Sequence, residues 1–198
     1  MNTISHEADE LIGYNTDVYG IEAALVRVAG LELLPENCVV LGAGGAARAV
    51  VYALGNRKEV QRITILNRTA KRAEDLAKDM EKLTGKTIDV GGMDADGQDR
   101  AFSEAGLVVN ATSLGMVPNI KDSLLMSERA VHSDLVLYDT VFNPLETRLM
   151  GQFREVGAQA FGGLDMLVFQ GARSFQIWTG IEPPVDVMKQ AVLSSLKT

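Results

Sequence analysis

One glycine-rich segment has the residue types and the spacing of a nucleotide-binding turn. Residues 42–47, GAGGAA, follow the pattern G-x-G-x-x-A, at the end of a strand predicted at 38–44 and the start of a helix predicted at 46–55. In that context Gly42 permits a tight turn, and Gly44 lets the backbone approach a pyrophosphate at a helix N-terminus. The alternative is a glycine-rich turn that binds nothing, but the strand–turn–helix context favours a nucleotide. The binding residues expected here are Gly42, Ala43, Gly44, Gly45 and Ala46.

The end of the next predicted strand, at 62–67, indicates which nucleotide is bound. NAD-binding domains usually place a carboxylate there, about 20 residues after the turn, for the ribose 2′-hydroxyl. This chain has Asn67, Arg68 and Thr69 instead, with Arg72 following. Arginine pairs with a 2′-phosphate that a carboxylate would repel. We therefore predict NADP, with Arg68 as the main phosphate ligand.

A solvated helix start is the other interpretation of Arg68 and Arg72. Basic side chains suit the N-terminus of a helix poorly, because the helix dipole is positive there. A bound anion explains the two arginines better.

The elements that must position these residues alternate between short apolar runs and longer stretches of helical period. Strands that are apolar throughout fit a parallel sheet covered on both faces. We predict an α/β protein with a Rossmann-like, doubly wound parallel sheet and an N-terminal hairpin over 1–16. The predicted strands are 38–44, 62–67, 86–92, 105–112, 133–142 and 158–163, and the predicted helices are 17–30, 46–55, 69–85, 144–157, 163–180 and 184–196.

Composition narrows the class of protein further. Of the 198 residues, 46% are hydrophobic and 23% are charged, and the net charge is −7. These values predict a cytoplasmic protein and argue against a nucleic-acid partner. No apolar run approaches the roughly 20 residues that span a membrane, so no membrane partner is expected. One cysteine and two scattered histidines predict no metal site, and Cys38 is expected to be a buried structural thiol.

Several segments taken together resemble one family, the shikimate dehydrogenases with their quinate/shikimate relatives. They occur in the order of the family and cover essentially the whole chain. These segments are NTI (2–4), GYNTD (13–17), GAGGAARA (42–49), NRT (67–69), NATSLGM (110–116), FNPLET (142–147) and GLDMLVFQG (163–171).

The resemblance implies NADP-dependent, reversible reduction of 3-dehydroshikimate to shikimate, a step of aromatic amino-acid and chorismate biosynthesis. Asp17 matches the catalytic aspartate, which works with a lysine on the reacting hydroxyl. Asn2 matches a substrate-binding asparagine with Thr3 beside it, and Gln170 matches a glutamine that contacts a substrate hydroxyl. Without the resemblance, Asp17 would be interpreted as the cap of helix 17–30.

The resemblance also places residues around the nicotinamide. One wall is the loop with Asn110, Thr112, Ser113 and Met116, and the other wall contains Gly163 and Met166. Core packing is the alternative for Met166, since methionine commonly fills apolar gaps. At the 2′-phosphate, Asn67 and Thr69 are expected to support Arg68.

We expect four parts along the chain. Residues 1–16 are the remnant of a substrate-binding domain, 17–30 a linker helix, 31–165 the NADP-binding domain, and 166–198 closing helices that contact the substrate domain. The family's catalytic lysine lies in a motif that this sequence lacks, so turnover by the 198 residues alone is expected to be slow or absent. Phe142 stands where the family usually has tyrosine, which affects substrate preference.

Alternatives of other classes remain open at this point. The chain could be a non-catalytic NADP-binding module or a fragment that needs a partner, or a quinate/shikimate dehydrogenase. Methylenetetrahydrofolate dehydrogenase and glutamyl-tRNA reductase share a similar cofactor loop, but the GYNTD and FQG segments argue against them. The N-terminal strand with Asn2 is expected to expose an edge that pairs with another chain, and a homodimer is a further expectation.

Overall fold

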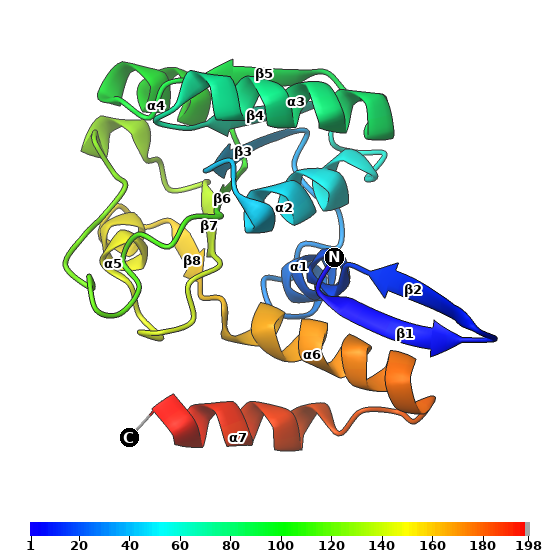
Figure 1. Ribbon diagram of the computed structural model, residues 1–198. Helices are drawn as coiled ribbons and strands as arrows, with labels where there is room; N and C mark the ends of the chain where they lie inside the picture. Colours follow the sequence, from blue (N-terminus) through cyan, green and yellow to red (C-terminus); the bar gives the residue numbers. More distant parts are fainter. Residues whose placement is uncertain (197–198) are drawn as a thin grey trace.

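A six-stranded parallel sheet forms the centre of the molecule in the computed structural model, which describes residues 1–196 (Figure 1). Neighbouring strands are parallel throughout, and the strand order reverses between β3 and β6. This is the doubly wound topology that the sequence predicts, so the fold class is confirmed. In spatial order the strands are β5 (Ile88–Gly91), β4 (Arg62–Leu66), β3 (Asn37–Leu41), β6 (Leu107–Asn110), β7 (Val136–Asp139) and β8 (Gln159–Phe161).

Helices cover both faces of this sheet. One apolar core lies between the sheet and α1, α2, α3 and α6, and a second lies between the sheet and α4 and α5. Along β3, Val40 belongs to the first core and Val39 to the second, which explains why the strand is apolar at successive positions. The helices are α1 (Thr16–Arg27), α2 (Gly45–Gly55), α3 (Ala70–Thr84), α4 (Ala95–Phe102), α5 (Arg148–Glu155), α6 (Leu164–Thr179) and α7 (Val185–Leu196), with a 3-10 turn at Glu128–Ala130.

The N-terminal segment forms the expected hairpin. Strands β1 (Thr3–Glu7) and β2 (Glu10–Tyr14) pair antiparallel as a separate two-stranded sheet. The indole Nε1 of Trp178, on α6, donates a hydrogen bond of 2.8 Å to the carbonyl oxygen of Ile4 and ties the hairpin to that helix. In Figure 1 the hairpin and α6 lie side by side, away from the sheet.

Most helix ends lie within two residues of the predicted positions, and the start of α5 and the end of α1 do not. Helix α3 follows Thr69 and stops at Gly85, which has a left-handed φ of 70°. The helix predicted at 144–157 begins only at Arg148, because Thr147 is its N-cap and accepts a hydrogen bond from the Met150 N–H. Helix α4 is not among the predicted helices; Asp94 caps it by accepting from the Gly97 N–H.

The structure also bears on the expected parts of the chain. Helix α1 ends at Arg27, so the linker helix predicted at 17–30 is shorter at its C-terminus. The boundary expected between 165 and 166 falls inside α6. The last two residues of the predicted closing segment, Lys197 and Thr198, lie outside the described residues.

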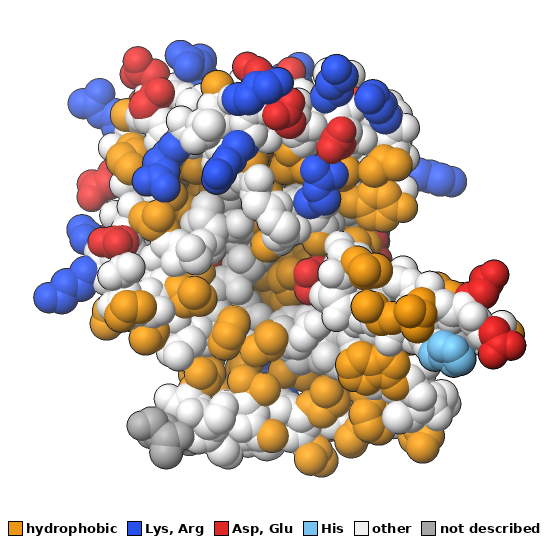
Figure 2. Space-filling model, in the orientation of Figure 1, with side chains coloured by type: hydrophobic (Ala, Val, Ile, Leu, Met, Phe, Trp, Pro, Cys, Tyr) orange, Lys and Arg blue, Asp and Glu red, His pale blue; other side chains and the backbone are white. Residues whose placement is uncertain are grey.

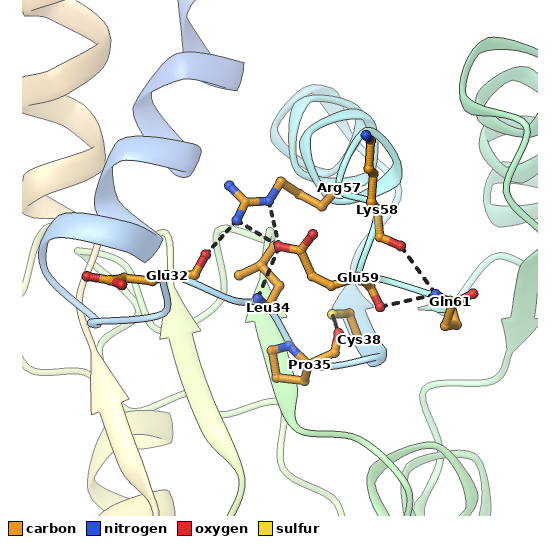
Figure 3. Close-up of polar contacts among 8 residues, drawn as sticks. All are labelled: Glu32, Leu34, Pro35, Cys38, Arg57, Lys58, Glu59 and Gln61. Carbon is orange, nitrogen blue, oxygen red and sulfur yellow. Dashed lines mark hydrogen bonds and ion pairs between the residues drawn. The ribbon is translucent and has the colours of Figure 1, made fainter.

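A polar cluster joins the segments around the starts of β3 and β4 (Figure 3). The Arg57 guanidinium donates from Nε to Glu59 Oε1 at 2.8 Å and from Nη2 to the carbonyl oxygen of Glu32 at 2.7 Å. The same Glu59 oxygen accepts from the Leu34 N–H. Cys38 is buried nearby, as the sequence predicts.

Candidate active site

The glycine-rich turn lies at the point where the strand order reverses. Gly42 follows β3 with a φ of +106°, and a Cβ at this position would lie 2.8 Å from Thr112 Cγ2. Only glycine combines that conformation with so close a neighbour. Gly44 is the N-cap of α2 and has no side-chain cap, so the first N–H groups of the helix are available to a ligand.

A cavity of about 290 Å³ opens beside this turn. It brings together most of the predicted cofactor residues, which come from the segments that follow β3, β4 and β6. Its lining consists of Gly42, Ala43, Gly44, Asn67, Arg68, Arg72, Met93, Ala111, Thr112, Ser113, Leu114 and Leu124. Gly45 lines an adjoining cavity together with Arg48 and Arg72.

The charge around this cavity suits a phosphate. Arg68 and Arg72 are exposed, and neither guanidinium forms an ion pair with any side chain among residues 1–196. Asn67 Nδ2 donates to the carbonyl oxygen of Thr69 at 2.9 Å and so shapes the turn that carries Arg68. A helix N-terminus and two free guanidinium groups fit the pyrophosphate and 2′-phosphate of NADP.

A second cavity, of about 330 Å³, also borders the start of α2, at Ala46. Two of the predicted substrate residues, Asn2 and Gln170, meet the second nicotinamide wall there, whereas Thr3 is buried and does not line the cavity. Figure 2 shows a hollow between the body of the molecule and the part that contains α6 and the hairpin. Its lining consists of Asn2, Asp17, Ala46, Thr140, Phe142, Gly163, Met166, Leu167 and Gln170.

The close approach of two helices places Asp17 and Gln170 at this cavity. Helix α1 carries Asp17 in its first turn, and α6 carries Gln170. The helices meet at Gly20, where an added Cβ would lie 2.8 Å from the Met166 carbonyl oxygen and 3.0 Å from Gln170 Cβ. A larger residue at position 20 would push the helices apart and widen the site.

The polar side chains of this cavity are hydrogen-bonded to one another. Asn2 Nδ2 donates to Asp17 Oδ1 at 2.9 Å and lies 3.5 Å from Gln170 Oε1. Asn15, rather than Asp17, is the N-cap of α1, and its side chain accepts from the Asp17 N–H. The Asp17 carboxylate is therefore available to the cavity, and the interpretation of Asp17 as a helix cap is wrong.

Asn110 and Met116 take different places from the rest of the predicted nicotinamide loop. Neither lines the two cavities. Asn110 is fully buried and donates from Nδ2 to Asp139 Oδ1 at 2.8 Å, while its Oδ1 accepts from the Thr112 N–H and hydroxyl. Thr112 and Ser113 do line the cavity beside the glycine-rich turn.

The buried carboxyl of Asp139 is a residue that sequence reasoning missed. Burial raises its pKa above the ordinary value, and hydrogen bonds from Thr147, the Val141 N–H and Asn110 lower it in part. It ends a strand beside Asn110, and this pairing of strand ends is the signal that could have found it. Thr16 and Ser174, behind the substrate residues, were also missed.

The parallel sheet, the glycine-rich turn at its switch point and the basic cavity beside it define a dinucleotide-binding domain of the Rossmann type. Comparison with known proteins makes the assignment more specific. The family model described as Shikimate / quinate 5-dehydrogenase matches residues 25–123, and that described as Shikimate 5'-dehydrogenase C-terminal domain matches 163–193. The shikimate dehydrogenase (NADP(+)) of Methanosarcina barkeri is 43% identical over 200 residues, which cover 100% of this chain and 69% of that protein. The chain belongs to the shikimate dehydrogenase family, as its motifs predict.

Comparison with solved structures supports the same family assignment. A crystal structure of a shikimate dehydrogenase in complex with NADP+ superposes with a TM-score of 0.88 at 38% identity, covering 98% of this chain and 66% of that one. A shikimate 5-dehydrogenase from Thermus thermophilus in complex with NADP(H) and shikimate gives a TM-score of 0.78 at 31% identity, covering 96% and 66%. The chain thus spans about two thirds of the length of these relatives. Within residues 1–196, no helix is long and apolar enough to cross a membrane, and no group of acidic, histidine or cysteine side chains could hold a metal ion.

Proposed function

We propose that this chain acts in the NADP-dependent interconversion of 3-dehydroshikimate and shikimate. The observation that carries the proposal is the pair of cavities that both border the start of α2. One has the glycine-rich turn and the unpaired Arg68 and Arg72, and the other has Asn2, Asp17 and Gln170. A dinucleotide that follows the turn from the first cavity reaches the second, where a small polyol can bind.

Different residues of the chain bind the cofactor, take part in proton transfer and orient the substrate. NADPH supplies the hydride when it is bound, and the residues that would hold it are Gly42–Gly45, Asn67, Arg68, Thr69, Arg72, Thr112 and Ser113. Asp17 lies beside the reacting oxygen and takes part in the proton transfer, because reduction of a ketone requires a proton to be delivered to the developing alkoxide. Asn2 and Gln170 offer amide groups that orient the hydroxyls of the substrate, and Gly163 and Met166 form the wall opposite.

An assay of the whole chain tests this proposal. We expect the chain to bind NADP and to reduce 3-dehydroshikimate with NADPH only slowly, because it lacks the motif with the family's catalytic lysine. We expect Asp17→Asn to lower that kcat by about 10²–10⁴-fold without changing the dissociation constant of NADP. Asp9→Asn is the matched control, because Asp9 is exposed in the hairpin turn and does not line the cavity. A chain that binds no NADP would overturn the proposal.

Two related outcomes are separated by the same assay. Tight binding of NADP without turnover would identify a binding module that needs a further chain or segment. Phe142 lines the substrate cavity where the motif usually has tyrosine, so quinate is tested beside shikimate. A higher kcat/KM for quinate would identify a quinate-preferring enzyme.

A further inference from the structure

Three buried hydroxyl groups lie directly behind the Asn2 and Gln170 amides. Thr3, Thr16 and Ser174 come from β1, α1 and α6, and they are only 2%, 2% and 7% exposed. The hydroxyl oxygens of Thr3 and Ser174 are 2.7 Å apart, and those of Thr16 and Ser174 are 3.1 Å apart. Burial of a hydroxyl group is unfavourable unless the group is hydrogen-bonded, so these three hydroxyls are expected to keep their hydrogen bonds to one another and to their neighbours.

Each hydroxyl of the cluster has at least one acceptor within hydrogen-bond distance. Ser174 Oγ donates to the backbone carbonyl oxygen of Gln170, one turn earlier, at 3.1 Å. Thr3 can donate to Ser174 at 2.7 Å or to Asn2 Oδ1 at 3.2 Å. The Thr16 hydroxyl has Asn2 Oδ1 at 3.1 Å and Gln170 Oε1 at 3.3 Å as acceptors.

The backbone N–H and the hydroxyl of Thr16 together determine which end of the Asn2 amide faces the cavity. Asn2 Oδ1 accepts from both the Thr16 N–H, at 2.9 Å, and the Thr16 hydroxyl. Its Nδ2 consequently points to Asp17 Oδ1. A flipped amide would set an oxygen against the Asp17 carboxylate and an NH₂ against the Thr16 N–H, so both contacts would be lost.

The Gln170 amide is held in the same way from the other side. Its Nε2 donates to the Leu167 carbonyl oxygen at 2.9 Å, and its Oε1 lies within reach of Thr16 and Asn2. We propose that Thr16 and Ser174 are positioning residues that fix the orientation of the Asn2 and Gln170 amides at the substrate cavity. The substrate named in the test rests on the proposed function; the positioning itself does not.

Removal of one hydroxyl without a change of shape tests the positioning. Thr16→Val replaces the hydroxyl by a methyl group, and Thr16→Ser keeps it. In the ¹⁵N-labelled whole chain we expect the side-chain amide protons of Asn2 to exchange with solvent about tenfold faster in Thr16→Val, and at the wild-type rate in Thr16→Ser. Ser174→Ala gives a smaller increase and supplies the test if Thr16→Val does not fold.

The matched control is Ser194→Ala on α7. Ser194 makes the same bond to the carbonyl oxygen four residues earlier, at 2.9 Å to Gln190, but it is exposed and outside the cluster. It should leave the exchange rate of Asn2 unchanged. Unchanged exchange in folded Thr16→Val and Ser174→Ala would overturn the proposal.

Kinetics give a second readout that is tied to the reaction. In Thr16→Val the KM for shikimate should rise about tenfold, while the KM for NADP stays at its wild-type value, because the cluster borders only the substrate cavity. A general loss of structure would instead alter both constants. Faster amide exchange in Thr16→Val together with a wild-type chain that binds no NADP would support the positioning and reject the proposed function.

Discussion

Asn110 and Asp139 are paired across the ends of β6 and β7, and their side chains are joined by a buried hydrogen bond of 2.8 Å. The Asp139 carboxylate also accepts from the Val141 N–H at 3.0 Å and from the Thr147 hydroxyl at 2.7 Å. The Asn110 amide oxygen accepts from Thr112. The Asn110–Asp139 pair therefore orders the loop after β6 and the loop after β7, both of which lead to the cavities. Through Thr147, the N-cap of α5, it also determines where that helix begins.

Asp139→Asn should weaken this arrangement. The new NH₂ group either faces the Thr147 hydroxyl, which then loses its acceptor, or displaces the Asn110 amide. Loss of one buried hydrogen bond should lower the free energy of unfolding by about 1–3 kcal/mol, as measured by urea titration. Asp134→Asn is the control, since Asp134 is exposed. Equal stabilities for Asp139→Asn and the wild type would contradict this role.

The pH dependence of that difference follows from the pKa of Asp139. Burial raises the pKa in the folded state, so the folded chain takes up a proton at a pH where the unfolded chain does not. As pH falls through the raised value toward the ordinary one, the wild type should gain stability relative to Asp139→Asn. Unfolding free energies measured across this window should show the difference increasing at lower pH. A difference that shrinks would show that the hydrogen bonds outweigh burial.

Arg68 is expected to select the cofactor. Arg68→Asp places a carboxylate where a 2′-phosphate is expected, so the KM or dissociation constant for NADP should rise about 100-fold, far more than that for NAD. Lys78→Asp, which reverses an exposed charge on α3, is the control for net charge. Equal effects of Arg68→Asp on both cofactors would exclude Arg68 as the ligand of the 2′-phosphate.

The sequence predicts the cofactor half of the site better than the positioning residues. The turn after β3 and the segment Asn67–Thr69 follow strands directly, so local pattern and spacing place them. Thr16 and Ser174 are 158 positions apart, and their contact depends on how α1 packs on α6. Neither has a pattern of its own, because a buried serine in a helix normally bonds to its own backbone.

Asp139 and α5 illustrate the same limit. Proline at 144 suggests the first position of a helix, but Thr147 takes the cap position because its hydroxyl can bond both to the Met150 N–H and to Asp139. That choice depends on a strand end eight residues earlier. Helix α4 was missed because its eight residues include few apolar positions and a glycine.

Cys38 should be chemically inert in the folded chain. It is buried, and burial, with a smaller contribution from Glu59, raises its pKa to about 12. The thiolate fraction at pH 8 is therefore about a thousandfold lower than for an exposed cysteine. A disulfide reagent should react only after urea is added, at a rate set by unfolding. Prompt reaction of the native protein would show that β3 opens to solvent.

The contact between α1 and α6 at Gly20 offers a test of how helix packing sets the substrate cavity. Gly20→Ala should raise helix propensity, yet its Cβ would meet the Met166 carbonyl oxygen at 2.8 Å and Gln170 Cβ at 3.0 Å. A backbone carbonyl cannot rotate away as a side chain can, so the two helices must separate. We expect a loss of about 1–3 kcal/mol in unfolding free energy and a higher KM for shikimate, because Gln170 moves away from Asn2.

Gly151→Ala is the matched control for that substitution. Gly151 lies within α5, and a Cβ there would have nothing within 4 Å. The same change should therefore stabilise the chain by about 0.5–1 kcal/mol and leave the KM for shikimate unaltered. Opposite signs for the two glycines in urea unfolding would locate the effect in the α1–α6 contact. If Gly20→Ala instead stabilised the chain as Gly151→Ala does, the close approach of α1 and α6 would not be what sets the distance between Asp17 and Gln170.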